Sequence, residues 1–229
     1  MQFVALDVAE VATIAGQFAV TVTGAALPPT GPGQCWLIQP EDPALAPLPV
    51  FPMLTEGRYL FWVAAQDLAQ PGSPLAEVAP GTPLRMLGPV GRKWLPPGHE
   101  GRLLVAANDP GRAWPLARLA LDQGWAVAWL WRFRIPEWAG QILPPVVEFH
   151  AGRASSELVD WADLMLIDQP DPAGYLKEIR GFGRLRNNGR AYGCQLPPMP
   201  CGFGGCQGCW THTRQGRSLA CLEGPWVQL

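Results

Sequence analysis

Four cysteines lie close together near the end of the 229-residue chain, at positions 201, 206, 209 and 221. Their spacing is C-x4-C-x2-C-x11-C. Thiolates held this closely need a cation or a metal cluster to balance their charge. A C-x4-C-x2-C run with a more distant fourth cysteine is typical of plant-type [2Fe–2S] sites. The spacing therefore predicts that Cys201, Cys206, Cys209 and Cys221 hold a two-iron cluster.

Glycines fill the gaps between these cysteines, at Gly202, Gly204, Gly205 and Gly208. A loop that wraps a cluster takes positive φ values and brings backbone N–H groups close to the sulfurs. Glycine does both without steric cost. We expect these four residues to shape the hydrogen-bonded shell around the cofactor.

The alternative is a structural zinc site in a protein through which no electrons move. Zinc usually takes two C-x2-C pairs with a longer separation, and this segment has one such pair. His212 lies nearby, but four cysteines already complete a ligand set, so we expect it at the surface. Cys35 and Cys194 lie beside apolar residues and are predicted to be core cysteines.

Composition excludes several other classes of protein. A formal net charge of −2 provides no electrostatic footprint for nucleic acid. No run of 18 apolar residues predicts a membrane span. The first residues include Asp7 and Glu10 and no basic cluster, which argues against a signal peptide. We therefore expect a cytoplasmic location, where clustered thiols more often bind metal than form disulfides.

Three regions differ in pattern along the chain. Residues 1–97 alternate short apolar runs with Pro/Gly turns, which predicts an antiparallel β-barrel or sandwich. Residues 98–190 alternate strands and helices, which predicts an α/β domain with a parallel sheet. Residues 191–229 form a small cluster-binding domain.

In the α/β region the buried runs RLLVAA, WAVAWLW, PVVEFH and ADLMLID are predicted strands. A helix is expected after the first of them, with Asp109 as its N-cap and Pro110 in its first turn. Further helices are expected near residues 155–161 and 171–181. The tryptophans of the second strand, Trp125, Trp129 and Trp131, are expected in the core or at a partner interface.

The motif MPCGFGGCQGC followed by CLEGPW resembles the cluster motif of the electron-transfer subunit of class 1B dihydroorotate dehydrogenase, in the ferredoxin–NADP reductase superfamily. Met199, Gly224 and Pro225 match it along with the cysteines. The stretches GPGQCWLI and PGTPLRMLGPVGRKW resemble segments of the family's barrel. The resemblance implies a flavin-binding barrel, an α/β nucleotide domain and a cluster domain, in that order. It also implies a hetero-oligomer with a flavin-containing dehydrogenase subunit or another redox protein.

The family's flavin-binding residues are replaced here. In the R-x-[YF]-[ST] motif the arginine pairs with the flavin diphosphate, and the corresponding stretch is PLPVFPML. Phe51 stands for the aromatic, but Pro49 and Pro52 replace the arginine and the hydroxyl, which removes the charge. A second phosphate-binding element is replaced by AQDLAQPGSP at residues 65–74. These changes argue against FAD.

The nucleotide-binding turn is altered as well, and reads VAANDPGRAW. Ala106 and Ala107 add Cβ atoms, Asp109 adds a negative charge, and Pro110 removes a helix N-terminal N–H. The element that flanks nicotinamide in the superfamily reads IDQPDP. We therefore do not expect NAD(P) to bind.

The sequence as a whole favours an iron–sulfur electron-transfer subunit, an oxidoreductase component without catalytic activity of its own. It contains no residue that we assign as a general acid or base. The main alternative is a conventional FAD-containing, NAD(P)H-oxidising reductase subunit. We expect Phe203, Trp210 and Trp226 to be poorly covered interface anchors, with Trp210 buried against a partner or the barrel.

Overall fold

The computed structural model describes residues 2–14, 17–24, 27–28, 30–40, 45–55, 58–64, 73–95, 98, 100–108, 110–137, 139–181, 183, 185 and 189–229. Its contacts divide the chain into two compact units. Unit 1 contains Met1–Trp94, Leu196–Thr211 and Arg217–Pro225. Unit 2 contains Leu95–Gln195, His212–Gly216 and Trp226–Leu229. The three-part division of the sequence given above stays a prediction.

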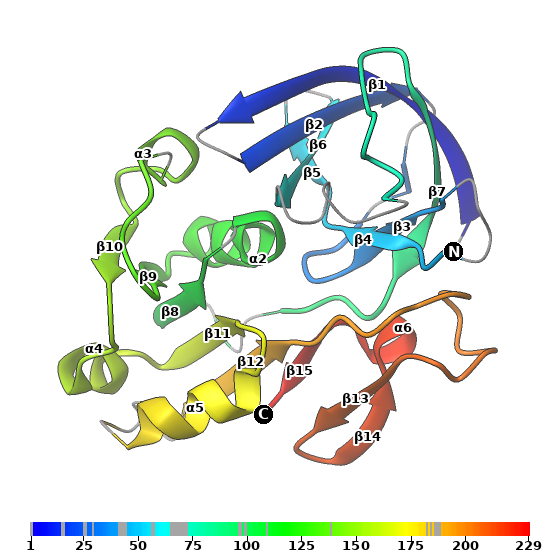
Figure 1. Cartoon of the computed structure of the whole chain (residues 1–229). Helices are drawn as coiled ribbons and strands as arrows, with labels where there is room; N and C mark the ends of the chain where they lie inside the picture. The colour runs from blue at the N-terminus through cyan, green and yellow to red at the C-terminus, as the bar shows by residue number, and fades with distance from the viewer. Residues whose placement is uncertain are drawn as a thin grey trace. The chain divides into compact units, whose positions relative to one another are not determined.

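Unit 1 is built on a curled antiparallel sheet (Figure 1). Among the described residues, its strand order is β4-β3-β7-β1-β2-β6-β5. The strands are β1 (Gln2–Ile14), β2 (Gln17–Gly24), β3 (Cys35–Ile38), β4 (Leu48–Val50), β5 (Met53–Thr55), β6 (Arg58–Ala64) and β7 (Pro83–Val90). This arrangement confirms the predicted barrel-like sheet.

Alternation of apolar and polar residues explains why these segments form strands. In β1, Leu6 and Val8 face the core at 2% exposure each, while Asp7 between them is exposed. Val20 and Val22 of β2 face the same core. A period of two places every second side chain on the inner face of a sheet, so burial of that face fixes the register.

Unit 2 contains a mostly parallel sheet with the order β10-β9-β8-β11-β12-β15. Its parallel strands are β8 (Arg102–Ala107), β9 (Ala126–Trp131), β10 (Glu148–Ala151), β11 (Leu164–Asp168) and β12 (Arg190–Cys194). The first, second and fourth of them are buried along almost their whole length. Strands covered on both faces by helices require such continuous apolar runs.

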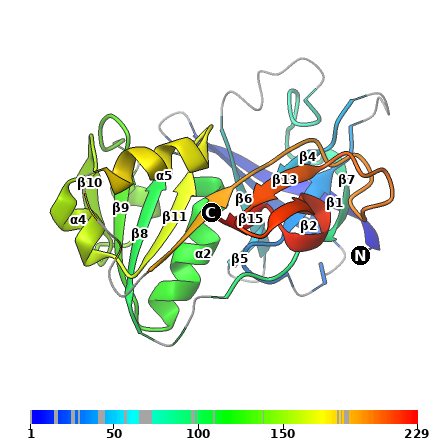
Figure 2. The same cartoon turned by 90° about the horizontal axis from the view of Figure 1, so that it is seen from below.

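Helices cover both faces of this sheet (Figure 2). They are α2 (Pro110–Asp122), α3 (Ala139–Ile142), α4 (Ser156–Trp161) and α5 (Pro172–Arg180). The Ser155 hydroxyl caps α4 by accepting from Leu158 N–H at 3.1 Å, and the Asp171 carboxylate caps α5 by accepting from Gly174 N–H at 2.9 Å. A side-chain acceptor at the N-cap satisfies an N–H group that has no partner within the helix. The α/β prediction is therefore confirmed.

The last strand of unit 2 was not foreseen. β15 (Trp226–Gln228) pairs antiparallel with β12, and Trp226 lies opposite Cys194. Trp226 is only 5% exposed, so the expectation of a poorly covered surface aromatic was wrong. Cys194 is also buried. A three-residue strand is too short to show a period of its own in the sequence.

Among the described residues, no helix has the length and apolar character needed to cross a membrane. The proposed N-cap Asp109 and residues 65–72 of the replaced phosphate element lie outside the described residues.

Candidate metal centre

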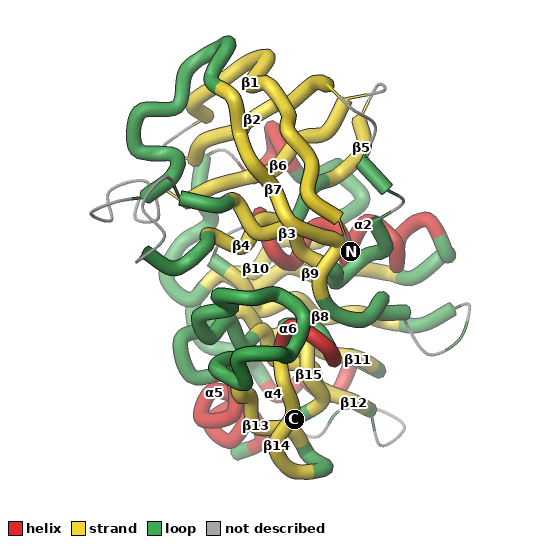
Figure 3. The backbone as a smooth tube through the Cα atoms, turned by 90° about the vertical axis from the view of Figure 1, so that its right-hand side faces the viewer, coloured by secondary structure: helices red, strands yellow, loops and turns green. Residues whose placement is uncertain are grey.

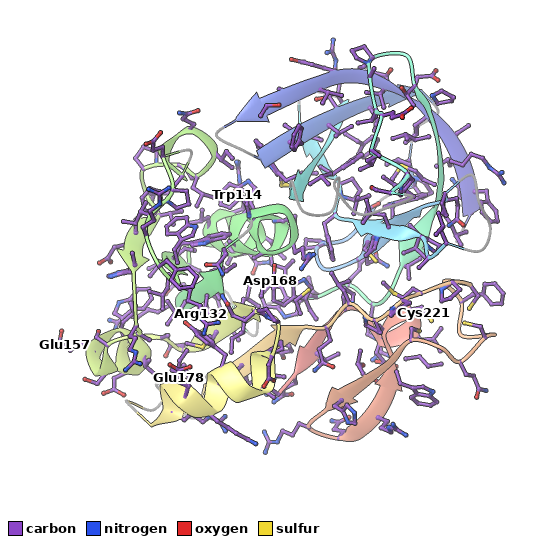
Figure 4. The ribbon with its side chains drawn as sticks, viewed as in Figure 1. Trp114, Arg132, Glu157, Asp168, Glu178 and Cys221 are labelled. Atoms are coloured by element: carbon purple, nitrogen blue, oxygen red, sulfur yellow. The ribbon has the colours of Figure 1, made fainter. Side chains whose placement is uncertain are left out.

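A loop and a short helix, joined by a hairpin, carry the four cysteines. Most of the segment before β13 is loop (Figure 3). It continues into β13 (Trp210–Thr213), β14 (Gly216–Leu219) and α6 (Ala220–Glu223). Figure 4 labels Cys221 on α6. The hairpin turns the chain back, so that the fourth cysteine returns to the other three.

The loop bends at two left-handed glycines between the first two cysteines. Gly202 has φ 72° and Gly204 has φ 83°, values that side-chain-bearing residues adopt only with strain. Gly205 and Gly208 are not in this region of φ. The bend brings the Cys206 N–H to within 3.4 Å of Cys201 Sγ, to which it donates. Backbone donors of this kind are what a metal-bound thiolate requires.

The four sulfurs stand as two pairs. Cys201 interacts with Cys206 through its sulfur. The Sγ atoms of Cys209 and Cys221 are 3.1 Å apart. The second pair is held by the backbone as well, since Ala220 N–H donates to the Cys209 carbonyl at 2.8 Å. The structure thus brings the predicted ligands together as two pairs.

The environments of the two pairs differ. Burial raises the pKa of the Cys201 thiol, but hydrogen bonds from the N–H groups of Cys206, Phe203 and Gly204 outweigh it and lower the pKa to about 7. Burial, followed by the adjacent Cys209 thiol, raises the pKa of the Cys221 thiol to about 12. Cys221 therefore needs a positively charged ligand to exist as a thiolate.

The pairing of the thiols is the arrangement that a two-iron cluster uses. A [2Fe–2S] cluster takes four thiolates in two pairs, one pair on each iron, whereas a tetrahedral zinc ion takes four ligands around one point. Among the described residues, no group of three or more His, Cys, Asp or Glu side chains is placed so that it could hold a metal ion. The paired thiols and the N–H donors both suit the cluster.

Exposure increases from one pair of cysteines to the other. Cys209 and Cys221 are 1% and 3% exposed, Cys201 is intermediate and Cys206 is exposed. Large apolar side chains of the same segment are also exposed: Phe203 is 59% exposed and Leu222 is 50% exposed. Trp210 is 45% exposed, with the Arg217 guanidinium 5.9 Å from its ring centroid. Trp210 is therefore not buried against the barrel. His212 is a surface residue, as expected.

A fifth thiol lies in unit 1. Cys35 on β3 is completely buried, and burial raises its pKa to about 12. Its electrostatic interaction with Cys221 shows that it lies near the ligand set. A buried neutral thiol behaves as a small apolar side chain, so the core assignment made from the sequence stands.

The carboxyl edge of the sheet in unit 2, where dinucleotides bind in related folds, is occupied by polar side chains. Asn108 accepts from Arg132 N–H at 3.1 Å and donates to the Gln169 side chain at 3.4 Å. Gln169 in turn donates to the Ala106 carbonyl at 3.3 Å. These bonds link the ends of β8, β9 and β11, where the strand order reverses and a diphosphate would have to approach.

Unit 2 also has a cavity of about 250 Å³ that sequence reasoning missed. It lies beyond the ends of β9 and β10, and Figure 4 labels Arg132 and Glu178, which both line it. The full lining is Arg132, Phe133, Gly152, Arg153, Ala154, Tyr175, Glu178 and Ile179. The signal in the sequence was an arginine directly or shortly after each of two predicted strands.

The barrel residues at the positions of the flavin contacts lack the charge and the accessible ring that bind a flavin. Pro49 lies within β4 opposite Leu37 and carries no charge. Phe51 is only 3% exposed, whereas a ring that stacks on a flavin needs an accessible face.

The cysteine segment is similar to a known domain. Residues 197–229 match the iron–sulfur cluster binding domain of dihydroorotate dehydrogenase B. The match covers this segment alone, so it shows what the segment is similar to and not the family of the whole chain. Among curated protein sequences, none is significantly similar to the chain.

Solved structures show the same fold over most of the chain. The NADH-dependent reduced ferredoxin–NADP oxidoreductase matches with a TM-score of 0.73 at 16% identity, covering 97% of this chain and 87% of that one. Phthalate dioxygenase reductase matches with a TM-score of 0.61 at 14% identity, covering 87% and 70%. A cytochrome P450 reductase from Amycolatopsis matches with a TM-score of 0.59 at 16% identity, covering 82% of this chain and 70% of that one. The fold is therefore ferredoxin-reductase-like, with the iron–sulfur domain at its C-terminal end.

Proposed function

We propose that this protein is an iron–sulfur electron-transfer subunit that passes single electrons between redox partners. The observation that carries the proposal is the convergence of Cys201, Cys206, Cys209 and Cys221 as two pairs, within the segment that matches an iron–sulfur binding domain. A [2Fe–2S] cluster bound there supplies a one-electron store. The glycines at 202, 204, 205 and 208 shape the loop around it.

The residues of this chain hold the cofactor asymmetrically. Buried Cys209 and Cys221 anchor one end away from water, while exposed Cys206 marks the end at which electrons enter or leave. N–H groups directed at Cys201 stabilise negative charge on its sulfur and so raise the reduction potential. No acid–base group is required, because an electron transfer of this kind makes and breaks no bond to hydrogen.

The partner we propose is a flavin-containing dehydrogenase subunit or another redox protein, in a hetero-oligomer. Three apolar side chains of the cysteine segment, Phe203, Leu222 and Trp210, are each at least 45% exposed. Exposed aromatic side chains of this kind act as anchors in protein interfaces. The proposal places the complex in the cytoplasm, because a cluster of free thiols persists in a reducing compartment.

A second candidate function is a nucleotide-dependent reductase, and one observation favours it. The cavity of unit 2 combines the guanidinium groups of Arg132 and Arg153 with Tyr175, a set that suits an anionic ligand. Against it stand the side-chain bonds of Asn108 and Gln169 at the sheet edge and the loss of charge at Pro49. Neither FAD nor NAD(P) belongs to the function we propose.

One experiment separates these functions. The protein is purified without oxygen and assayed for iron, acid-labile sulfide, zinc and releasable flavin. We expect about two iron and two sulfide per chain, a red-brown spectrum and no flavin. Stoichiometric zinc without iron would establish the structural zinc site instead, and stoichiometric FAD would establish the conventional reductase.

A further inference from the structure

The end of β7 touches the segment that carries the fourth cysteine. Gly91 directly follows β7 and donates its N–H to the Cys221 carbonyl at 3.1 Å. Both residues belong to unit 1, although they lie far apart in the sequence. The barrel therefore holds the backbone of this ligand directly.

The contact requires glycine on both sides. Gly91 has φ 87° and Gly224 has φ 98°. A Cβ atom at Gly91 would lie 2.7 Å from Gly224 Cα and 3.3 Å from its nitrogen. Real Cβ atoms do not approach a backbone so closely, and a backbone cannot turn aside as a flexible side chain can. Any side chain at Gly91 must push α6 and Cys221 away from the barrel.

The residue after the first cysteine packs against β7 and its neighbour β3. A Cβ at Gly202 would lie 3.1 Å from both Leu37 of β3 and Leu87 of β7. The loop after Cys201 and the helix that carries Cys221 thus both pack against the β3–β7 strand pair or the residue that follows it. By contrast, Cys206 is exposed.

An exposed ion pair accompanies the backbone contact but does not explain it. Arg92 and Glu223 are 3.0 Å apart, with side chains 70% and 43% exposed. Pairs this exposed contribute little, because water and salt screen them. The close backbone approach at Gly91 is therefore the stronger link.

We propose that the β3–β7 strand pair of the barrel supports the cluster-binding segment, and that Gly91 is a positioning residue for Cys221. Its N–H and its lack of a side chain fix the orientation of that ligand, and thereby the potential and the retention of the cluster. Groups that orient a metal ligand in this way alter metal affinity about 10- to 100-fold when changed. The inference rests on the proposed function and assigns a role to the barrel, whose flavin residues are replaced.

The chain contains a matched control for this role. Gly81 has the same φ of 87° as Gly91, but a Cβ there would have no heavy atom within 4 Å. Gly91→Ala and Gly81→Ala therefore impose the same backbone strain, and only the first collides with Gly224. A difference in iron retention or reduction potential between the two variants is therefore due to the contact with Gly224 and not to the positive φ.

The experiment compares both variants with wild type in the full chain. We expect Gly91→Ala to lose iron to a chelator about 10-fold faster or more, and to shift the reduction potential in a redox titration followed by EPR. Gly81→Ala should match wild type in both measurements. Wild-type potential and iron retention in Gly91→Ala would overturn the proposal.

Two additions keep failure of the inference distinct from failure of the proposed function. In iron-free protein, Gly91→Ala should expose the buried Cys221 to alkylation while Gly81→Ala leaves it protected, a result that needs no cluster. If Gly91→Ala fails to fold, Gly202→Ala provides the milder test, since the side chains of Leu37 and Leu87 can yield. If wild-type protein purified without oxygen contains no iron, the proposed electron-transfer function is refuted. If Cys221 is alkylated equally in all variants, the proposed positioning role of the barrel is refuted.

Discussion

The Sγ atoms of Cys209 and Cys221 lie 3.1 Å apart, although a complete hairpin separates the two residues in the sequence. Both side chains are buried, and their neighbours in the ligand set lie closer to solvent. The site therefore has an inner pair, held by backbone contacts, and an outer pair that a partner can approach.

Replacement of an outer ligand should remove the cluster without unfolding the metal-free chain. Cys206 is exposed, so Cys206→Ser should leave the melting temperature of the metal-free protein unchanged. It should abolish the visible spectrum and the extra stability that metal binding confers. Absorption spectra and thermal melts with and without iron test this. Cys194→Ala is the control, and its spectrum should stay that of wild type; a Cys206→Ser protein with the wild-type spectrum would exclude Cys206 as a ligand.

Loss of Trp210 should weaken partner binding and spare the cluster. Trp210 is 45% exposed and contacts Arg217, so truncation removes a large exposed apolar surface. We expect Trp210→Ala to raise the Kd for the partner by about 10-fold, as interface aromatics commonly do, with unchanged iron content. The partner is first isolated by co-purification from native extract, and its Kd for each variant is then measured by titration. Phe133→Ala, an exposed aromatic in unit 2, should leave the Kd unchanged; equal effects of the two would contradict the assignment.

Nicotinamide nucleotides should bind weakly or not at all. The bonds of Asn108 to Arg132 N–H and to Gln169 occupy the edge where a diphosphate would approach. Calorimetric titration with NADH and with NADPH should show no low-micromolar binding, and neither should bleach the cluster of the isolated chain. A low-micromolar Kd that Arg153→Ala abolishes would instead assign the cavity of unit 2 to these nucleotides.

Two ion pairs on α2 should differ in their contribution to stability. Arg112 lies 3.3 Å from the Asp168 carboxylate, whose side chain is only 6% exposed, while Arg118 and Asp122 are 61% and 57% exposed. The variant Arg112→Ala removes a bond to a buried charged group, so it should lower the free energy of unfolding by about 1.5–3 kcal/mol. Arg118→Ala should cost about 0.5 kcal/mol or less. Denaturant unfolding of both variants measures this, and equal losses would show that Asp168 does not depend on Arg112.

The comparison of sequence and structure separates local from long-range information. The strands β8, β9 and β11 were predicted because each is a continuous apolar run, and burial on both faces leaves that mark in any sequence. The four cysteines could be predicted as a ligand set because their spacing along the chain limits how far apart the thiols can lie. The resemblance of the cysteine motif identified the iron–sulfur domain for the same reason, since its residues are close neighbours in sequence.

Contacts between segments far apart in the chain were decided by the tertiary structure alone. The burial of Trp226 follows from its pairing with β12, and no local pattern marks a strand of three residues. The division of the sulfurs into an inner and an outer pair depends on how the hairpin folds back. The contact of Gly91 with Gly224 depends on where the barrel and α6 meet. A glycine in the sequence shows that a side chain is absent, but only the folded chain shows which backbone occupies the space.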